Sequence, residues 1–470
     1  MTTDDTICAI STAPGMGAIA VIRLAGEQAF SICEKVFIPA KSGKILSQQA
    51  ANSIHFGRIN DGEKDVDEVL VSLFKAPHSF TGDHIVEIAC HGAPYIQQQL
   101  LQLLIKNGAR LAQPGEFTQR AFLNGKMDLS QAEAVADLIA SSSEAARRVA
   151  LQQMRGGFSS ELIQLRERLL WFISLIELEL DFSEEDVEFA DRKELVALVN
   201  EIEAHITRLV NSFSLGNVIK NGIPVAIVGH TNAGKSTLLN ALLNEERAIV
   251  SDIHGTTRDA IEDNINIGGI SFRFIDTAGI RTTADKIESL GIQLTYSKVK
   301  LASIVLLLVD VTDLEDKIHE AVSDILGKLD RERQQLIVII NKIDLSDSAT
   351  IQEKFSQQAF SELSGHHSVV PIAAKFRTNL DQLTTELLRT INLQAVNNDE
   401  VIVTNARHHE ALTQALQSLL RVKDGLHSNI SGDFLAQDIR EVLHYLGSIT
   451  GQINTDEVLG NIFKHFCIGK

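Results

Sequence analysis

The hydrophobic pattern of the first 125 residues consists of short β-rich runs separated by glycine turns. These runs cover residues 18–24, 68–74 and 85–89. Residues 95–106 instead repeat apolar side chains at helical spacing. The pattern predicts an α+β domain over residues 1–125.

Helical spacing replaces this pattern between residues 130 and 212. The segment is rich in Ala, Leu, Glu and Arg, contains no proline, and has glycine only at Gly156 and Gly157. From residue 222 to about 392, short apolar strands alternate with helices, which is typical of a doubly wound parallel sheet. Amphipathic helix returns over residues 404–466.

The order helix, α/β, helix predicts an α/β domain inserted into a helical domain whose two halves pack together. We therefore expect a multidomain chain with an α+β N-terminal domain, an α-helical bundle domain and an inserted α/β domain. The expected segments are residues 1–125, 126–218, 219–392 and 393–470. Three consecutive domains with a separate helical tail are the alternative arrangement.

Composition indicates a soluble globular chain. The 61 Asp and Glu outnumber the 43 Lys and Arg, so a nucleic-acid partner would need a local basic patch or a second protein. The four cysteines are scattered without zinc-ligand or redox spacing, which fits a reducing compartment. The acidic N-terminus and the short apolar runs predict a cytoplasmic protein with no signal peptide and no membrane span.

A phosphate-binding loop follows the apolar run at residues 225–228. Residues 229–236, Gly-His-Thr-Asn-Ala-Gly-Lys-Ser, match G-x-x-x-x-G-K-[ST] and lead into a helical run at residues 237–243. The glycines let backbone N–H groups turn toward phosphates, and the helix N-terminus adds positive potential. We expect Lys235 to bridge the terminal phosphates and Ser236 to offer its hydroxyl to magnesium.

Two later motifs complete the predicted nucleotide site, and the second of them selects guanine. The sequence Asp276-Thr277-Ala278-Gly279 places a carboxylate near the magnesium shell and a flexible amide beside the γ-phosphate. The buried run at residues 336–340 ends in Asn341-Lys342-Ile343-Asp344, and the last carboxylate can accept two N–H groups that guanine presents and adenine does not. We therefore expect GTP, not ATP, as the substrate.

The segment Ala373-Ala374-Lys375 lies where GTPases close over the base, with alanine in place of the usual serine. The backbone contact should survive that change, because it does not depend on the side chain.

The segment between the P-loop and Asp276 contains Thr256 and Thr257, where a switch threonine should complete magnesium coordination. A simple polar loop is the alternative. Ile280 is apolar where small GTPases carry a water-positioning glutamine, so hydrolysis must use another device. Glu288 is the candidate, and a solvated charge on a helix face is the alternative.

With these motifs placed, the whole chain resembles the MnmE (TrmE) family of tRNA-modifying GTPases. Two N-terminal stretches carry the resemblance, TICAISTAPG at residues 6–15 and GEFTQRAFLNGKMDL at residues 115–129. Phe-Cys-Ile-Gly-Lys at residues 466–470 carries it at the other end. His230-Thr231 replaces the Arg-Pro that is commoner in the family, at side chains that should not touch phosphate.

The resemblance implies a GTP hydrolase with a Ras-like doubly wound P-loop domain. With an FAD-containing partner of the MnmG type, it would add a carboxymethylaminomethyl or aminomethyl group to carbon 5 of the wobble uridine of certain tRNAs. It also implies a homodimer built through folate-binding N-terminal domains, GTPase domains that meet during turnover, and a heterotetramer or larger complex with the partner. No membrane is involved.

By the same resemblance, the family's potassium-binding asparagine falls on Asn232, with Ser251, Ile253 and Thr256 completing the ion's surroundings. A monovalent cation against the phosphates can supply the charge that an arginine finger supplies elsewhere.

Magnesium falls to Ser236 and Thr257, and the water-orienting glutamate falls on Glu288. The full set of expected GTP contacts comes from the P-loop, the switch segments, the guanine motif and the closing segment. They are Asn232, Ala233, Gly234, Lys235, Ser236, Thr237, Ser251, Asp252, Ile253, His254, Gly255, Thr256, Thr257, Asp276, Thr277, Ala278, Gly279, Asn341, Lys342, Asp344, Ala373, Ala374 and Lys375.

The implied folate pocket uses Arg23, Glu87, Lys126 and Lys470 and would bind a 5,10-methylene- or 5-formyl-tetrahydrofolate. Arg23 and Lys126 can hold the glutamate carboxylates, and Glu87 can pair with the pterin N–H edge. Without the resemblance, Arg23 and Glu87 would be interpreted as ordinary polar strand residues.

Cys467 leaves two interpretations open. It is either a catalytic thiol that attacks uridine, since a nearby lysine favours the thiolate, or a small packed residue near the folate. A C-terminal lipidation box is excluded, because Gly469 is not aliphatic and Lys470 is an unusual last residue.

The alternative function is a GTP-timed binding switch, such as an Era-like ribosome-assembly GTPase. Such proteins carry a basic RNA-binding appendage. This chain instead has a folate-type N-terminal domain and a terminal Cys-Ile-Gly-Lys, and it is acidic overall. The flanks therefore favour the tRNA-modifying enzyme.

Overall fold

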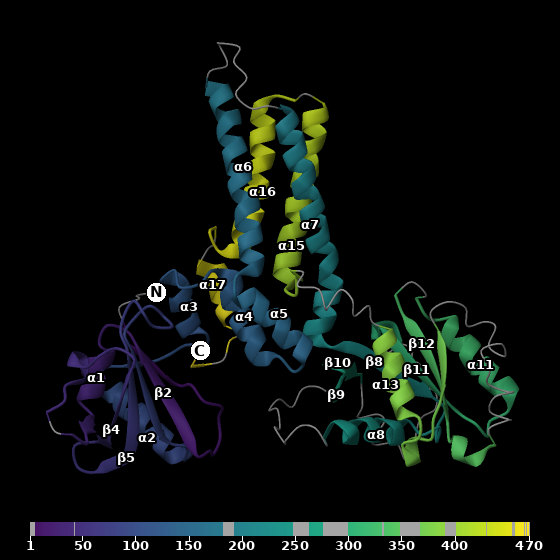
Figure 1. Cartoon of the computed structure of the whole chain (residues 1–470), viewed down its shortest axis with the longest axis horizontal. Helices are drawn as coiled ribbons and strands as arrows, with labels where there is room; N and C mark the ends of the chain where they lie inside the picture. The colour runs from purple at the N-terminus through teal and green to yellow at the C-terminus, as the bar shows by residue number, and fades with distance from the viewer. Residues whose placement is uncertain are drawn as a thin grey trace. The chain divides into compact units, whose positions relative to one another are not determined.

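A computed structural model gives the architecture of the chain (Figure 1). It describes residues 5–41, 43–181, 192–247, 263–275, 299–330, 333–347, 367–390, 401–428, 430–453, 456–464, 466 and 468–469. The chain divides into two compact units. Unit 1 consists of Met1–Ala140, Ala150–Thr207 and Glu410–Lys470, and unit 2 consists of Ser141–Val149 and Arg208–His409.

A seven-stranded sheet forms one part of unit 1, with the strand order β3-β4-β5-β6-β2-β1-β7. Neighbouring strands are antiparallel except for β1 and β7, which are parallel. The strands are β1 (Ile7–Ile10), β2 (Ile19–Ala25), β3 (Phe37–Pro39), β4 (Ser53–Asn60), β5 (Asp65–Phe74), β6 (Ile85–His91) and β7 (Arg110–Leu111).

Alternation along the strands gives this sheet two different faces. In β2, Ala20, Ile22 and Leu24 are buried, whereas Val21 and Arg23 between them are half-buried. The buried face packs against two helices and forms the main core of this part of the unit. These helices are α1 (Ala29–Glu34) and α2 (Pro94–Lys106).

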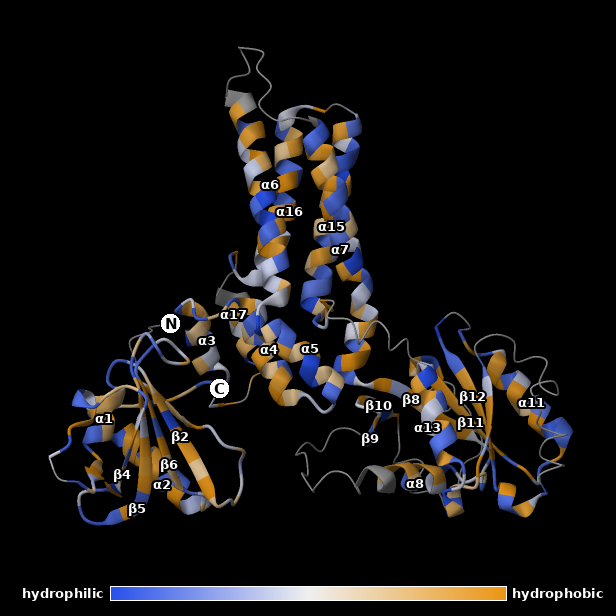
Figure 2. Cartoon of the chain, in the orientation of Figure 1, coloured by the Kyte–Doolittle hydropathy of each residue, from blue (hydrophilic) through white to orange (hydrophobic). Residues whose placement is uncertain are grey.

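The rest of unit 1 is helical, and the long helices α6 and α16 pack along each other. Apolar and polar residues alternate around both helices, as amphipathic packing requires (Figure 2). The division between the units falls within α5, α7 and α15, which contribute residues to both. The helices are α3 (Glu116–Leu123), α4 (Leu129–Ala140), α5 (Glu144–Met154), α6 (Gly157–Asp181), α7 (Arg192–Asn221), α15 (Ala406–His427), α16 (Gly432–Thr450) and α17 (Asp456–Phe463).

Unit 2 contains a six-stranded sheet with the order β13-β12-β11-β8-β10-β9. Its neighbouring strands are parallel from β13 to β10, and the central strands are apolar almost throughout, as a sheet covered on both faces requires (Figure 2). The strands are β8 (Ile223–Gly229), β9 (Asp263–Ile267), β10 (Ile270–Phe274), β11 (Ile304–Asp310), β12 (Gln335–Asn341) and β13 (Ser368–Pro371).

Helices cover both faces of this second sheet, which makes it doubly wound. One core joins the sheet to α8, α13 and the end of α7, and a second core joins its other face to α11. The bounds of these helices are α8 (Lys235–Arg247), α11 (Glu315–Leu326) and α13 (Leu380–Arg389). Among the described residues, no helix combines the length and hydropathy needed to cross a membrane.

The predicted fold class is confirmed, with one difference in the second sheet. A parallel sheet was expected, but β9 pairs with β10 in the antiparallel sense. Gly268 and Gly269 join the two strands with φ values of 59° and 81°, which is the geometry of a tight hairpin turn. Two glycines supply these positive φ angles without strain, so the chain reverses there instead of crossing over through a helix.

Candidate nucleotide and folate sites

The parallel strands of unit 2 bring the nucleotide motifs to one edge of the sheet. β8 ends at Gly229, β11 at Asp310 and β12 at Asn341, all at carboxyl ends. Asp310 and Asn341 are direct register partners, and Gly229 is the partner of Leu308. Ligands of open α/β sheets bind at this carboxyl edge.

The P-loop turns from β8 into α8 through two residues with left-handed backbone. Asn232 has a φ of 66° and Gly234 a φ of 104°. Successive N–H groups in such a turn form an anion-binding concavity, and the N-terminus of α8 at Lys235 adds positive potential. A Cβ on Gly234 would lie 2.2 Å from Nδ2 of Asn341, so only glycine fits.

The ammonium group of Lys235 lies over the loop. It donates hydrogen bonds to the backbone carbonyl of Gly229 at 2.6 Å and to that of His230 at 2.8 Å. Ser236 follows in the first turn of α8. Backbone N–H groups, a cation and a hydroxyl therefore lie in one place, and they fit a nucleotide phosphate with its magnesium ion.

Asn341 joins three motifs that are far apart in the sequence. Its Nδ2 donates to the carbonyl of Ala233 in the P-loop at 2.8 Å, and its Oδ1 accepts from the N–H of Ala374 at 3.0 Å. The residue is 3% exposed, so both bonds are shielded from water. One side chain thus fixes the phosphate loop and the base-closing segment relative to each other.

The remaining guanine-motif residues lie around this junction. Asp344 is exposed in a short 3-10 helix, Ile343–Leu345. Ala373 and Ala374 are buried, and the backbone of Ala373 pairs with Thr378. The hydrogen bonds between Ala373 and Thr378 are backbone bonds, so they do not depend on the side chain at residue 373.

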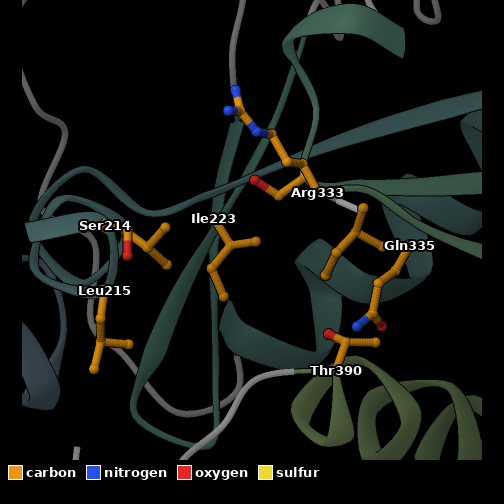
Figure 3. A pocket seen from close by; sticks show the side chains of 9 residues that line it. Ser214, Leu215, Ile223, Arg333, Gln335 and Thr390 are labelled. Carbon is orange, nitrogen blue, oxygen red and sulfur yellow. The ribbon is translucent and has the colours of Figure 1, made fainter. Parts of the chain in front are cut away.

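A cavity of about 290 Å³ lies at the opposite, amino edge of the same sheet (Figure 3). Its lining comes from α7, the beginnings of β8, β11 and β12, and the end of α13. The lining residues are Ser214, Leu215, Val218, Ile223, Ser303, Ile304, Arg333, Gln335 and Thr390. None of them is a predicted nucleotide contact, so this cavity is separate from the nucleotide edge.

Several predicted site residues lie outside the described part of the chain, and their roles stay predictions. They are Ser251, Asp252, Ile253, His254, Gly255, Thr256, Thr257, Asp276, Thr277, Ala278, Gly279, Glu288, Cys467 and Lys470.

In unit 1, two predicted folate residues contact each other directly. Arg23 of β2 and Glu87 of β6 are register partners, and their side chains form an ion pair at 2.8 Å. The guanidinium also lies 5.7 Å from the ring centre of Phe80 and 5.6 Å from that of Phe117. Arg23 therefore has little freedom, and it holds the carboxylate of Glu87 in place.

Lys126 contacts the same loop that carries Phe80. Its ammonium donates to the carbonyl of Pro77 at 2.9 Å. Near the other end of the chain, the carbonyl of Gly469 accepts a hydrogen bond from the hydroxyl of Ser11 at 3.1 Å, just beyond β1. Since β1 pairs with the strand that carries Arg23, these contacts lie around one region of the sheet.

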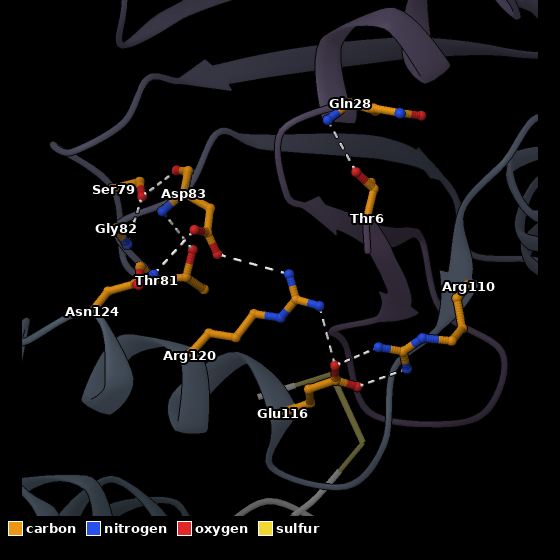
Figure 4. A network of polar contacts seen from close by, with 10 residues as sticks. All are labelled: Thr6, Gln28, Ser79, Thr81, Gly82, Asp83, Arg110, Glu116, Arg120 and Asn124. Carbon is orange, nitrogen blue, oxygen red and sulfur yellow. Dashed lines mark hydrogen bonds and ion pairs between the residues drawn. The ribbon is translucent and has the colours of Figure 1, made fainter. Parts of the chain in front are cut away.

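A polar network that the sequence motifs did not reveal supports the same loop (Figure 4). Figure 4 shows Arg120 between Asp83 and Glu116, with Arg110 on the far side of Glu116. Arg110 donates to Glu116 at 2.7 and 3.1 Å, and Arg120 donates to it at 3.2 Å. Asn124 donates to Asp83 at 3.0 Å. These contacts connect α3 to the turn before β6.

The three cysteines within the described residues are free and buried. Burial raises the pKa of Cys8 and that of Cys90 to about 11, and it raises the pKa of Cys33 further. Burial therefore disfavours the reactive thiolate form of all three cysteines at neutral pH.

These features define a P-loop GTP-binding protein. The phosphate loop follows β8, the guanine motif follows β12, two strands away in the sheet, and the buried Asn341 joins them. Family models for the MnmE helical domain and for the GTP-binding protein TrmE N-terminus match residues 129–467 and 6–126. The chain belongs to the MnmE family of tRNA modification GTPases, and it is a GTP hydrolase.

Its relatives match over almost their whole length. The tRNA modification GTPase MnmE of Bacteroides fragilis is 61% identical over 467 residues, covering 99% of each chain. That of Flavobacterium johnsoniae is 54% identical over 471 residues, covering all of both chains. Among solved structures, a point variant of Aquifex aeolicus Era bound to GDP.AlF4- is 26% identical, with a TM-score of 0.27, and the match covers 42% of this chain and 66% of that one.

Proposed function

We propose that the chain is a potassium-activated GTPase that modifies the wobble uridine of certain tRNAs together with an FAD-containing protein of the MnmG type. Family membership supports the tRNA reaction, and the P-loop geometry carries the cation part. Asn232 has a left-handed backbone conformation within the P-loop. It lies three residues before Lys235, where α8 begins and where we expect the phosphates to bind. Its side-chain oxygen is the kind of ligand that a hard monovalent cation takes.

In this proposal each residue of the nucleotide edge has one task. Lys235 binds the terminal phosphates, and Ser236 with Thr257 holds magnesium. Asn232, with Ser251, Ile253 and Thr256, holds potassium, which supplies positive charge where negative charge develops on the phosphates. Glu288 orients the attacking water.

We further propose that unit 1 forms a homodimer through the open face of its sheet. Phe56, Leu70, Ala89 and Val21 are consecutive register partners across β4, β5, β6 and β2. Phe56 is 54% exposed and Leu70 is 47% exposed, so an apolar row crosses the face. Contiguous exposed apolar rows of this kind are typical of protein interfaces.

The next row on the same face supports a folate site beside that interface. It consists of Ser72, Glu87 and Arg23, which are again register partners. The proposed one-carbon donor, a tetrahydrofolate, has an N–H edge that suits the carboxylate of Glu87, and its carboxylates suit Lys126 and Lys470. Cys467 as a nucleophile toward uridine stays a prediction.

The deciding experiment is steady-state GTP hydrolysis in potassium and in sodium at matched ionic strength. We expect potassium to stimulate the wild-type rate by about 10-fold or more, and Asn232→Ala and Glu288→Ala to abolish this gain. Asn52→Ala is the matched control, because Asn52 also has a left-handed backbone, with a φ of 57°, but lies in unit 1. A rate that ignores the cation would contradict potassium activation and leave only a generic GTPase.

A further inference from the structure

Asp310, the last residue of β11, shares its carboxylate between two partners. Oδ2 accepts a hydrogen bond from the ammonium of Lys342 at 2.5 Å. Oδ1 accepts from the N–H of Thr312 at 3.0 Å and from its hydroxyl at 2.8 Å. The side chain of Asp310 is 14% exposed. The turn after the strand therefore fixes one oxygen, and the other oxygen faces the lysine of the guanine motif.

The strand register explains why these two groups meet. Asp310 is the register partner of Asn341, and both residues end their strands. Lys342 directly follows Asn341, so it lies next to Asp310. Lys342 has a φ of 65°, a left-handed conformation that residues with a Cβ rarely adopt. Backbone strain of this kind is found where a site requires one geometry.

An unanchored lysine side chain samples many rotamers, and ordering it on ligand binding costs entropy. Lys342 is only 33% exposed, and no second partner of its ammonium is found among the described residues. With the ammonium fixed by Asp310, the apolar stem of Lys342 has few conformations left. Lysine stems pack well against flat apolar surfaces such as a purine ring.

The charge of Asp310 is suited to this task. Burial raises the pKa of Asp310, but the hydrogen bonds from Lys342 and Thr312 outweigh burial, and the pKa lies below its usual range. The carboxylate is therefore ionised at neutral pH and attracts the ammonium throughout the physiological range.

We propose that Asp310 is a positioning residue for guanine-nucleotide binding: it fixes Lys342, so that the lysine stem forms one wall of the base pocket while Asp344 reads the base edge. This role rests on guanine-nucleotide binding at the carboxyl edge of the sheet. Asp310 belongs to none of the sequence motifs. In the sequence it is only the acidic residue that directly follows the apolar run at residues 304–309.

The test is a double-mutant cycle read out by the Kd for a fluorescent GDP analogue. We expect Asp310→Asn to weaken binding by about 10-fold, since the lysine loses its charged anchor, while kcat at saturating GTP changes by less than about twofold. Asp310→Glu should recover part of the affinity. In the Lys342→Met background, Asp310→Asn should have no further effect, because the group that it positions is gone.

Asp313→Asn is the matched control. Asp313 lies on the same turn, where its carboxylate accepts a long hydrogen bond from the N–H of Asp310 at 3.4 Å and makes no contact with Lys342 among the described residues. Its replacement should leave the Kd unchanged. Equal weakening by Asp310→Asn with and without Lys342 would overturn the positioning role, as would an Asp310→Asn variant that binds like wild type. A wild-type chain that does not bind GDP would instead overturn the nucleotide site itself.

Discussion

Gly234 lies where the phosphate loop and the guanine motif touch. Its φ of 104° and the 2.2 Å that would separate a Cβ from Nδ2 of Asn341 leave no room for a side chain. Gly234→Ala should displace Asn341 and break its bonds to Ala233 and Ala374. Two lost buried hydrogen bonds together with backbone strain correspond to about 100-fold weaker GDP binding. Isothermal titration calorimetry measures this change.

Gly327→Ala is the matched control for this prediction. Gly327 follows α11 with a right-handed backbone, and the atoms nearest to an added Cβ are 3.5 Å away. Its replacement should leave GDP affinity unchanged. A Gly234→Ala variant with wild-type affinity would show that Asn341 is not needed to hold the two motifs together.

At the scale of single residues, the sequence identified the phosphate loop and the guanine motif from their fixed spacing, and the roles of the single residues stay predictions. The P-loop and the guanine motif are each contiguous in the sequence, so identifying them required only the motif and the apolar strand before it. Asp310 was not predicted, because its role depends on the register between β11 and β12, and a sequence pattern does not contain strand register.

Elements were predicted most reliably where their hydrophobic pattern is local. The expected helix at residues 95–106 is α2, Pro94–Lys106, and the expected strands of unit 2 are present. The antiparallel β9 and β10 hairpin was not predicted, because its direction depends on two glycines in the turn. The network around α3 was not predicted either, since Asp83 and Arg120 come together only when the helix packs on the loop.

Glu116, the first residue of α3, gives a prediction for the pH dependence of stability. Burial raises its pKa, but the hydrogen bonds from Arg110 and from the N–H of Gln113 outweigh burial and hold the pKa below its ordinary value of 4.5. A lowered pKa stabilises the fold above pH 4.5, and this stability is lost as the pH falls through the folded-state pKa. Glu116→Gln should therefore destabilise unit 1 at pH 7 by about 2 kcal/mol, allowing for the partial exposure of Arg110.

Urea unfolding at pH 7, 5 and 4 tests this expectation. The fluorescence of Trp171 reports unfolding, because it is the single tryptophan and lies in unit 1. The difference between wild type and Glu116→Gln should shrink as the pH falls below 4.5. Glu201→Gln is the control, since Glu201 forms an exposed pair with Arg168. A difference that stays constant with pH would exclude ionisation of Glu116 as its cause.

For the whole molecule, the sequence predicted three kinds of structure, but the limits of the domains stay predictions. The expected limit between the helical and α/β segments is residue 218, yet α7 runs unbroken through Arg192–Asn221. A helix that contributes residues to two units has no linker signature, because its periodicity and its lack of proline continue across the division. Domain limits of this kind are set by tertiary contacts.

The open face of the unit 1 sheet gives the last prediction, which concerns assembly. Leu70 lies in the middle of the row between Phe56 and Ala89, and a charge there would be buried in the proposed homodimer. An unpaired buried carboxylate costs several kcal/mol, so Leu70→Glu should weaken dimerisation by about 100-fold or more. Sedimentation velocity at several concentrations measures this as a shift to monomer.

The control for this experiment is Ile105→Glu. Ile105 is 41% exposed, close to the 47% of Leu70, but it lies on α2, which covers the other face of the sheet. If solubility or general hydrophobicity governs assembly, both variants should behave alike. If the open face is the interface, only Leu70→Glu should become monomeric, and because Arg23 and Glu87 lie in the next row, the same variant should also alter tetrahydrofolate binding.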